Sequence, residues 1–231
     1  MKIFIDRQKI NTRAQLSNLA SVGGLALLLV SVVLSLFFPS WSKLAYILMI
    51  VGMGIAMIGI FFANRWVRKP RPEDSLSQAL KSYDDHYCLY HYPRLPCEHL
   101  LLTPTGIVIL EVYNIAGSFT YRQGRWKEAM TIGRALRYIV EERVGDPIMS
   151  VKQMEVELKE FLKNELGTGI AVPIRSIVVF THPAVDLDVK GTPIPVCKID
   201  KLKKQISSHA PKLMPEVYDK LCLLLERVTL E

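Results

Sequence analysis

The chain has 231 residues, half of them hydrophobic, with four cysteines and a formal net charge of +7, a composition that excludes a disordered chain and argues against a disulfide framework. The charge is uneven, because residues 1–71 hold nine Lys and Arg and one Asp, for +8, and the other residues hold 20 Lys and Arg and 21 acids, for −1. The basic balance therefore gives no indication of a nucleic-acid-binding face after residue 71.

Two uncharged segments, residues 20–38 and 44–63, are each long enough to cross about 30 Å of hydrocarbon as a helix. Only the short link PSWSK separates them, so we expect a tight transmembrane hairpin. Four small residues are candidates for close helix contact: Gly23, Gly24, Gly52 and Gly54. The alternative is a pair of buried helices in a soluble core.

Basic residues gather on both flanks of this hairpin, and the link between the segments holds only Lys43. Positive flanks stay in the cytoplasm, so both termini should be cytoplasmic. We therefore expect an integral protein of a bacterial-type inner or plasma membrane. Residues 1–71 would be the membrane anchor and residues 72–231 a cytosolic domain.

The rest of the chain alternates helical and strand patterns. Residues 76–83 predict a helix, residues 86–93 a strand, and residues 98–103 and 107–114 a hairpin. A second hairpin should turn near Gln123-Gly124. The later predicted elements are a helix that Asp146 caps, a buried strand over 174–183, a short strand over 194–199 and helices over 200–208 and 215–228. This order is typical of a mixed α/β domain with a partly antiparallel sheet.

The first hairpin carries two acids. Its turn, TPTG at residues 103–106, has the pattern of a type I turn. If Leu102 pairs with Ile107, the same register places Glu98 opposite Glu111, on one face of the sheet. Two carboxylates so placed either lie at an exposed sheet end or hold a cation such as Mg²⁺ against a phosphate.

The segment CEHLLLTPTGIVILEVYNIAGSFTYRQGRW, from Cys97 to Trp126, resembles the nuclease-related domain family, NERD. That family shows an acid before a hydrophobic strand, a turn of the T-P-x-G type, and a strand that ends in E-x-K-N. The helix DPIMSVKQMEVELKEFL and the strand IRSIVVFTHP extend the resemblance, which covers about Glu73 to Gln205. It implies a restriction-endonuclease-like fold with a mixed sheet flanked by helices, and a site for Mg²⁺.

Carried over by position, the resemblance assigns the metal-binding acids to Glu98 and Glu111. It also implies catalytic roles at Tyr113, in the lysine position of E-x-K, and at Gln153 on the following helix. A phenol donates a hydrogen bond but brings no positive charge, so the motif is degenerate at Tyr113. Basic residues that could replace the lysine are Arg122, Arg125 and Lys127.

Three hypotheses for function remain open at this point. The first is a membrane-tethered, Mg²⁺-dependent nuclease with an impaired active site. The second is a module that binds nucleic acid or protein without catalysis. The third is a membrane-anchored scaffold that forms homo-oligomers through its transmembrane hairpin and binds a protein partner. The sequence decides neither between these nor between DNA and RNA.

Overall fold

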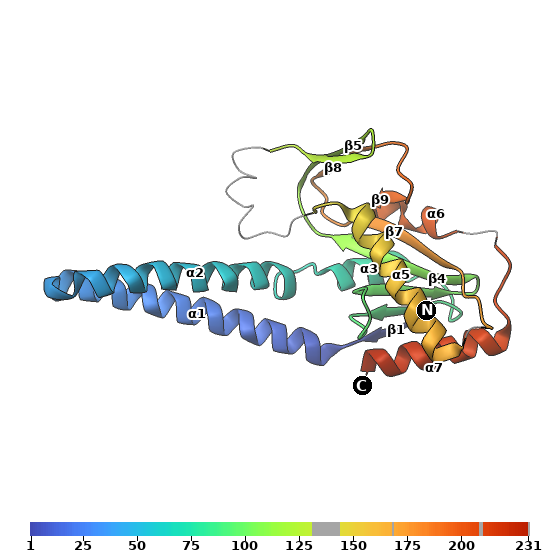
Figure 1. Ribbon diagram of the computed structural model, residues 1–231, viewed down its shortest axis with the longest axis horizontal. Coiled ribbons are helices and arrows are strands. Elements are labelled where there is room, and N and C mark those ends of the chain that lie inside the picture. Colours follow the sequence, from blue (N-terminus) through green and yellow to red (C-terminus); the bar gives the residue numbers. More distant parts are fainter. Residues whose placement is uncertain (131–143, 168, 208–209, 231) are drawn as a thin grey trace. The chain divides into compact units, whose positions relative to one another are not determined.

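The computed structural model describes residues 1–130, 144–167, 169–207 and 210–230. They divide into two compact units (Figure 1). One unit contains Met1–Asp6, Pro72–Ala129 and the described residues from Val144 onward. The other contains Arg7–Arg71. The helical segment is therefore inserted between the first six residues and the remainder of the α/β unit.

The helical unit is a pair of long helices. Helix α1 (Arg7–Phe37) is joined through the short 3₁₀ turn η1 (Pro39–Trp41) to α2 (Ser42–Trp66). By length and composition both helices are able to cross a membrane. Most of their side chains are exposed, whereas a helix in the core of a soluble protein is mostly buried.

The two helices meet along a seam that repeats every seven residues. A seven-residue repeat keeps one stripe of each helix facing its partner. The buried positions on α1 are Ile10, Ser17, Gly24 and Ser31, and those on α2 are Ala45, Gly52, Gly59 and Trp66. The Ser17 hydroxyl donates a hydrogen bond across the seam to the Gly59 carbonyl at 3.0 Å.

Three glycines permit this close approach, and they are only partly those expected from the sequence. A Cβ on Gly24 would lie 2.5 Å from the Ala56 nitrogen, and one on Gly52 would lie 3.0 Å from the Leu27 Cβ. Gly59 is equally tight against Ser21. Gly23 and Gly54 have nothing within 4 Å of such an atom, so the prediction that they contribute to the contact was wrong.

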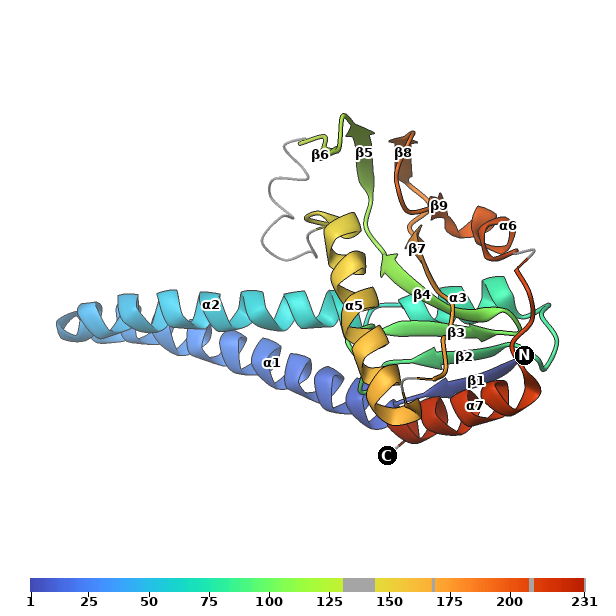
Figure 2. The ribbon, with the colours of Figure 1, turned by 45° about the vertical axis from the view of Figure 1, so that its right-hand side comes forward.

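The α/β unit is built on a sheet of six strands in the order β1-β2-β3-β4-β7-β9 (Figure 2). The strands are β1 (Lys2–Ile5), β2 (Cys88–His91), β3 (His99–Thr103), β4 (Gly106–Tyr113), β7 (Ile174–Phe180) and β9 (Val196–Lys198). The sheet is mixed, because β3 is antiparallel to both β2 and β4, while β1 pairs in parallel with β2, β7 with β4 and β9 with β7. The predicted mixed α/β architecture is thus confirmed.

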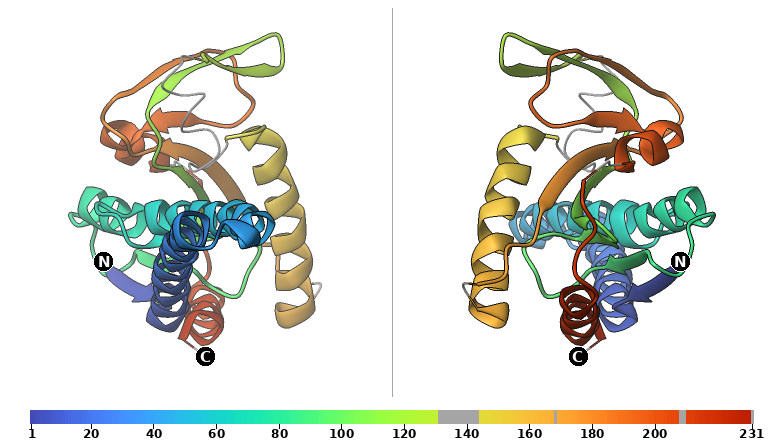
Figure 3. Two further views of the ribbon diagram at one scale, coloured as in Figure 1. Left: turned by 90° about the vertical axis from the view of Figure 1, so that its left-hand side faces the viewer. Right: turned by 90° about the vertical axis from the view of Figure 1, so that its right-hand side faces the viewer.

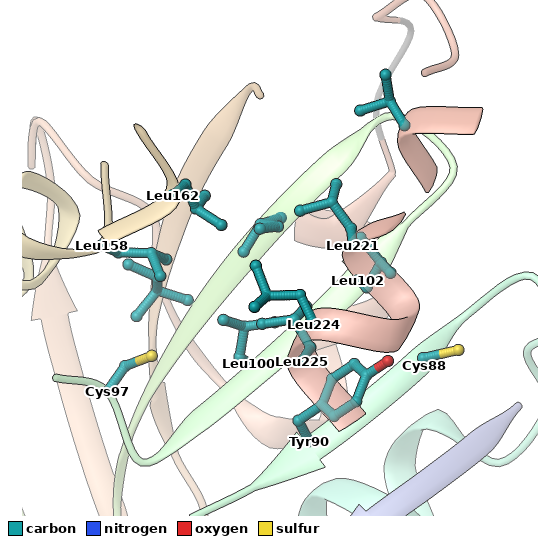
Figure 4. Close-up of a cluster of buried hydrophobic side chains, with 13 residues drawn as sticks. Cys88, Tyr90, Cys97, Leu100, Leu102, Leu158, Leu162, Leu221, Leu224 and Leu225 are labelled. Carbon is teal, nitrogen blue, oxygen red and sulfur yellow. The ribbon is translucent and has the colours of Figure 1, made fainter. Parts of the chain in front are cut away.

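Helices cover both faces of this sheet. Alternate residues of β2, β3 and β4 pack against α5 (Pro147–Leu166) and α7 (Pro215–Leu230), as the cluster in Figure 4 shows. The other set packs against α3 (Pro72–Leu80) and α6 (Leu202–Ile206), which follows the short 3₁₀ turn η2 (Ile199–Lys201). Because successive side chains of a strand point to opposite faces of the sheet, each of these strands contributes residues to two separate hydrophobic cores.

Helix α5 begins where its sequence predicts. The Asp146 carboxylate accepts hydrogen bonds from the amides of Ile148 and Met149, and Pro147 occupies the first turn. Val151, Leu158 and Leu162 then form the buried stripe. This helix crosses from the end of β4 to the start of β7, which lets the two strands run parallel.

A second sheet has three strands and begins where the chain leaves β4 and β7, since β5 follows β4 and β8 follows β7 in sequence (Figure 3). It contains β5 (Gly117–Arg122), β6 (Arg125–Glu128) and β8 (Val185–Val189). The hairpin of β5 and β6 turns at Gln123 and Gly124, as expected, with a positive φ at both residues. Strands β1 and β8 were not expected from the sequence, since each is completed by parallel pairing with a distant segment.

Candidate active site

The β3–β4 hairpin has the register that its turn predicts. Leu102 lies opposite Ile107, and Leu100 lies opposite Ile109. The Thr103 hydroxyl donates to the Gly106 carbonyl at 2.8 Å and accepts from the Thr105 amide at 3.2 Å. Gly106 has a φ of 138°, and a Cβ there would collide with the Pro173 carbonyl oxygen. The last residue of the turn, Gly106, must therefore be a glycine.

Glu98 and Glu111 flank the opposite end of this hairpin. Glu98 directly precedes β3, and its carbonyl accepts the Tyr92 amide at 2.6 Å. The described cross-strand pairs end at Leu100 and Ile109, so the direct opposition of the two acids stays a prediction. Both side chains are half-buried.

The buried Cys97 thiol lies next to Glu98 in the chain. The pKa of Cys97 is raised to about 12, first by burial and also by the charges of Glu111 and Glu98. A charge influences a titrating group in this way only when it is nearby or poorly screened. Both carboxylates are therefore close enough to the Cys97 thiol to oppose its ionisation.

Tyr113 points to the same face of β4 as Glu111, as strand alternation predicts. Its hydroxyl donates to the Glu111 Oε1 at 3.0 Å and lies 3.4 Å from the Val144 carbonyl. Its ring is 4% exposed and stacks on Phe180 with centroids 5.5 Å apart. The phenol therefore occupies the position from which a lysine on this strand would reach the carboxylate.

Gln153 has a different environment. Its side chain lies on the exposed face of α5, and its amide donates to the Glu157 carboxylate at 2.8 Å. Glu155, on the neighbouring face, instead accepts a 2.6 Å hydrogen bond from the Ser176 hydroxyl of β7. Sequence reasoning passed over Glu155, although its position four residues after Val151 places it on the apolar stripe.

The family model for the nuclease-related domain, NERD, matches residues 71–181. This segment is a NERD domain. The match runs from the start of α3 to the residue after β7 and includes all four of the predicted site residues. Searches of curated proteins and of solved structures gave no significant match.

Three basic residues of the NERD domain are the candidates to replace the lysine of E-x-K. Arg122, Arg125 and Lys127 are exposed on the β5–β6 hairpin. The Arg122 guanidinium donates to the Asp188 carboxylate at 2.8 Å. That exposed pair stabilises the small sheet at most weakly. A role for these three cations in place of the family lysine stays a prediction.

Glu98 and Glu111 are the residues that would hold a metal ion if the domain binds one. Among the described residues no group of three or more His, Cys, Asp and Glu side chains is placed to hold a metal ion. Mg²⁺, however, commonly uses one or two carboxylates together with water and phosphate oxygens. Half-buried carboxylates that both act on the Cys97 thiol fit that limited requirement.

A buried polar network lies next to the site and was not predicted from the sequence. The Tyr92 hydroxyl donates to the Glu73 carboxylate at 2.8 Å. The Nδ1 atoms of His91 and His99 are 2.9 Å apart, and the His91 Nε2 is 3.1 Å from the Ser77 hydroxyl. His91 therefore joins Ser77 to His99 within this network.

Proposed function

We propose that this protein is a membrane-anchored, nuclease-related protein whose NERD domain binds nucleic acid at Glu98 and Glu111 and hydrolyses it poorly. The observation that carries the proposal is the hydrogen bond from the Tyr113 hydroxyl to the Glu111 carboxylate at 3.0 Å. It keeps the acid oriented toward the site while the position of the family lysine carries no positive charge.

A divalent cation would be held by Glu98 and Glu111. When bound, Mg²⁺ would polarise a phosphodiester oxygen and offset its negative charge. The Tyr113 hydroxyl donates to one oxygen of Glu111, which holds the carboxylate on the same strand face as the phenol. In the lysine-containing family motif, an ammonium group would help to orient water and stabilise the developing charge on the phosphate. Without it, binding is retained and the chemical step is slow.

The membrane anchor follows from α1 and α2. Strand β1 precedes α1 and pairs with β2, which follows α2, so both ends of the helix pair belong to one sheet. A folded sheet lies on one side of a membrane, and two crossings return the chain to that side. The basic flanks favour the cytoplasmic side of a bacterial-type inner or plasma membrane.

Replacement of Tyr113 by Lys tests the proposal on the full chain in detergent or lipid nanodiscs. DNA and RNA oligonucleotides would be incubated with Mg²⁺ or Mn²⁺, and cleavage would be followed on denaturing gels. We expect Tyr113→Lys to raise the cleavage rate about 10²-fold, because a donor aimed at developing charge contributes about that factor. Glu111→Gln should abolish cleavage.

Calorimetric titration with Mn²⁺ provides the second measurement. Glu98→Gln and Glu111→Gln should each remove the binding heat, whereas Glu160→Gln, on the exposed face of α5, should leave it unchanged. Unaltered Mn²⁺ binding in both site variants would overturn the assignment of the metal-binding acids. Oligonucleotide binding that is equal with and without metal would show that nucleic acid is recognised elsewhere.

A second candidate is a membrane-tethered scaffold with no nucleic-acid role. The −1 net charge of the residues after position 71 favours it, because it offers no general attraction to a polyanion. Oligomer formation through the transmembrane hairpin belongs to this candidate. Crosslinking in native membranes tests it: discrete dimers or larger species are expected, and a strictly monomeric protein would contradict it.

A further inference from the structure

Arg13 of α1 lies against two aromatic rings of α2. Its guanidinium carbon is 5.9 Å from the centroid of the Phe62 ring and 5.9 Å from that of the Trp66 ring. Phe62 and Trp66 are four residues apart, so they lie one turn apart on the same side of α2. A cation within about 6 Å of a ring centroid is attracted to the face of the ring. The two rings therefore restrain the guanidinium beside α2.

The helix pair supplies no carboxylate to neutralise this cation. Residues 7–71 hold eight Lys and Arg and no Asp or Glu. Lys9, one turn before Arg13, and Arg65, next to Trp66 in sequence, add positive charge at the same end of the pair. Arg13 is exposed, so its N–H groups can donate to a ligand from outside the pair. An anion from the surroundings can therefore balance the charge.

The depth of Arg13 in a membrane follows from its neighbours. It is the last charged residue before a segment, residues 14–42, that contains no charge. One turn further along each helix, about 5 Å deeper, Leu16 and Ile58 are 49% and 55% exposed. A bilayer adds roughly 5–7 Å of headgroup on each side of its hydrocarbon core. With these apolar side chains in the hydrocarbon, the guanidinium lies at the level of the lipid phosphates.

We propose that Arg13, Phe62 and Trp66 form a binding site for the phosphate of an anionic phospholipid in the cytoplasmic leaflet. The planar guanidinium presents paired N–H donors that match two phosphate oxygens. The two rings keep the guanidinium in place beside α2, and Leu16 and Ile58 contact the acyl chains below the headgroup. The site rests on the membrane anchor proposed above and is independent of any chemistry in the NERD domain.

Other cations near the same end of the helix pair provide a contrast. Arg7 and Arg68 are also exposed. Among the described residues, ring contacts are recorded for Arg13 and not for these two arginines. A general attraction to an anionic membrane surface acts on every cation near it. Restraint by two rings acts on Arg13, so matched substitutions can separate the two effects.

The test uses the full chain in a neutral detergent, with dioleoylphosphatidylglycerol or dioleoylphosphatidylcholine added to the micelles. Native mass spectrometry measures the lipid that stays bound. Because such micelles have no charged surface of their own, retained lipid reports direct contact. We expect preferential retention of phosphatidylglycerol, which Arg13→Gln should reduce about fivefold, the effect of one cation near an anionic lipid. Arg7→Gln, with the same change of charge, should retain as much as the unmodified protein.

A substitution that leaves the charge unaltered tests the part played by the rings. Phe62→Leu should reduce retention of phosphatidylglycerol toward that of Arg13→Gln, whereas Phe61→Leu, at the adjacent position, should not. Equal retention in Arg13→Gln and Arg7→Gln would overturn the proposal. Displacement of the lipid by soluble glycerol phosphate would also overturn it, since a site that includes the acyl chains should not accept a headgroup alone.

Failure of the lipid site and failure of the membrane anchor give different results. Release of the full chain from membranes by alkaline carbonate would contradict the anchor, and with it the lipid site. A chain that stays in the membrane fraction but retains no more phosphatidylglycerol than phosphatidylcholine would contradict the lipid site alone.

Discussion

Tyr92 joins the candidate site to the buried network behind it. Its amide donates a hydrogen bond to the Glu98 carbonyl, and its hydroxyl donates one to the Glu73 carboxylate. Its φ of 61° is in the left-handed region, which costs a residue with a side chain about 1 kcal/mol. Fixed contacts at both ends of Tyr92 offset that strain and set the position of Glu98.

Substitution of Tyr92 by Phe should destabilise the α/β unit by about 1–3 kcal/mol, because a buried carboxylate loses its phenolic donor. Urea unfolding of the full chain in detergent, followed by tryptophan fluorescence, measures the change. Tyr121→Phe, at a half-exposed ring, is the control and should shift stability by less than about 0.5 kcal/mol. Equal effects of the two substitutions would contradict the role given to Tyr92.

His91 makes stability depend on pH. Burial lowers its pKa to about 3, although the Asp74 carboxylate acts in the opposite direction. In the unfolded chain the pKa is about 6.5, so between these values the unfolded state binds a proton that the folded state does not. The free energy of unfolding should therefore fall as pH is lowered from about 6.5 toward 3, by about 1.4 kcal/mol per unit. Above pH 6.5 His91 contributes no slope.

Comparison of His91→Asn with His86→Asn isolates this contribution. His86 is exposed, so its replacement should leave the slope between pH 6.5 and 4 as it is in the unmodified protein. His91→Asn should flatten that slope, measured by urea unfolding at a series of pH values. An unchanged slope in His91→Asn would show that other groups cause the acid sensitivity.

At the scale of the element, the helix pair depends on which glycines lie in the seam. Gly24→Ala should weaken the contact by about 1–3 kcal/mol, because its Cβ would collide with the Ala56 backbone. Gly23→Ala, next to it in sequence, should be neutral or slightly stabilising, since Ala favours helix and the space is open. Thermal unfolding of the two variants in the same detergent measures the difference. Equal melting temperatures would contradict the assignment of Gly24 to the contact between α1 and α2.

The sequence predicted local features of these elements well and long-range features poorly. Turn chemistry was enough to predict the β3–β4 register, and strand alternation was enough to place Tyr113 beside Glu111. The apolar stripe likewise left Gln153 outside the core, where the structure exposes it. These are properties of a few neighbouring residues.

Features set by distant partners were not predictable in this way. Strand β1 is only four residues long and is defined by β2, far along the chain. The φ of Tyr92 depends on Glu73 and Glu98 holding it from separate elements. Gly23 and Gly24 are adjacent in sequence, and only the position of α2 determines which of them must be small for the two helices to approach closely. Composition contains none of this information.

At the scale of the whole molecule, the proposed topology gives a labelling prediction. In intact cells a membrane-impermeant maleimide should label Ser40→Cys, in the link between α1 and α2, but not Arg68→Cys, after α2. Both positions should be labelled once the membrane is opened. Labelling of Arg68→Cys in intact cells would place the NERD domain outside and overturn the cytoplasmic assignment.

The pairing of β1 with β2 also constrains the order of assembly. Lys2 lies beside Cys88 in the finished sheet, and the helix pair is made between them. At a synthesis rate of about 5–20 residues per second, β1 waits roughly 4–17 s for its partner. If α1 and α2 cross the membrane as proposed, a chain in which only one of them inserts leaves β1 and β2 on opposite sides of the bilayer. Such a chain cannot complete this edge of the sheet, so pairing of β1 with β2 would distinguish it from a chain in which both helices are inserted.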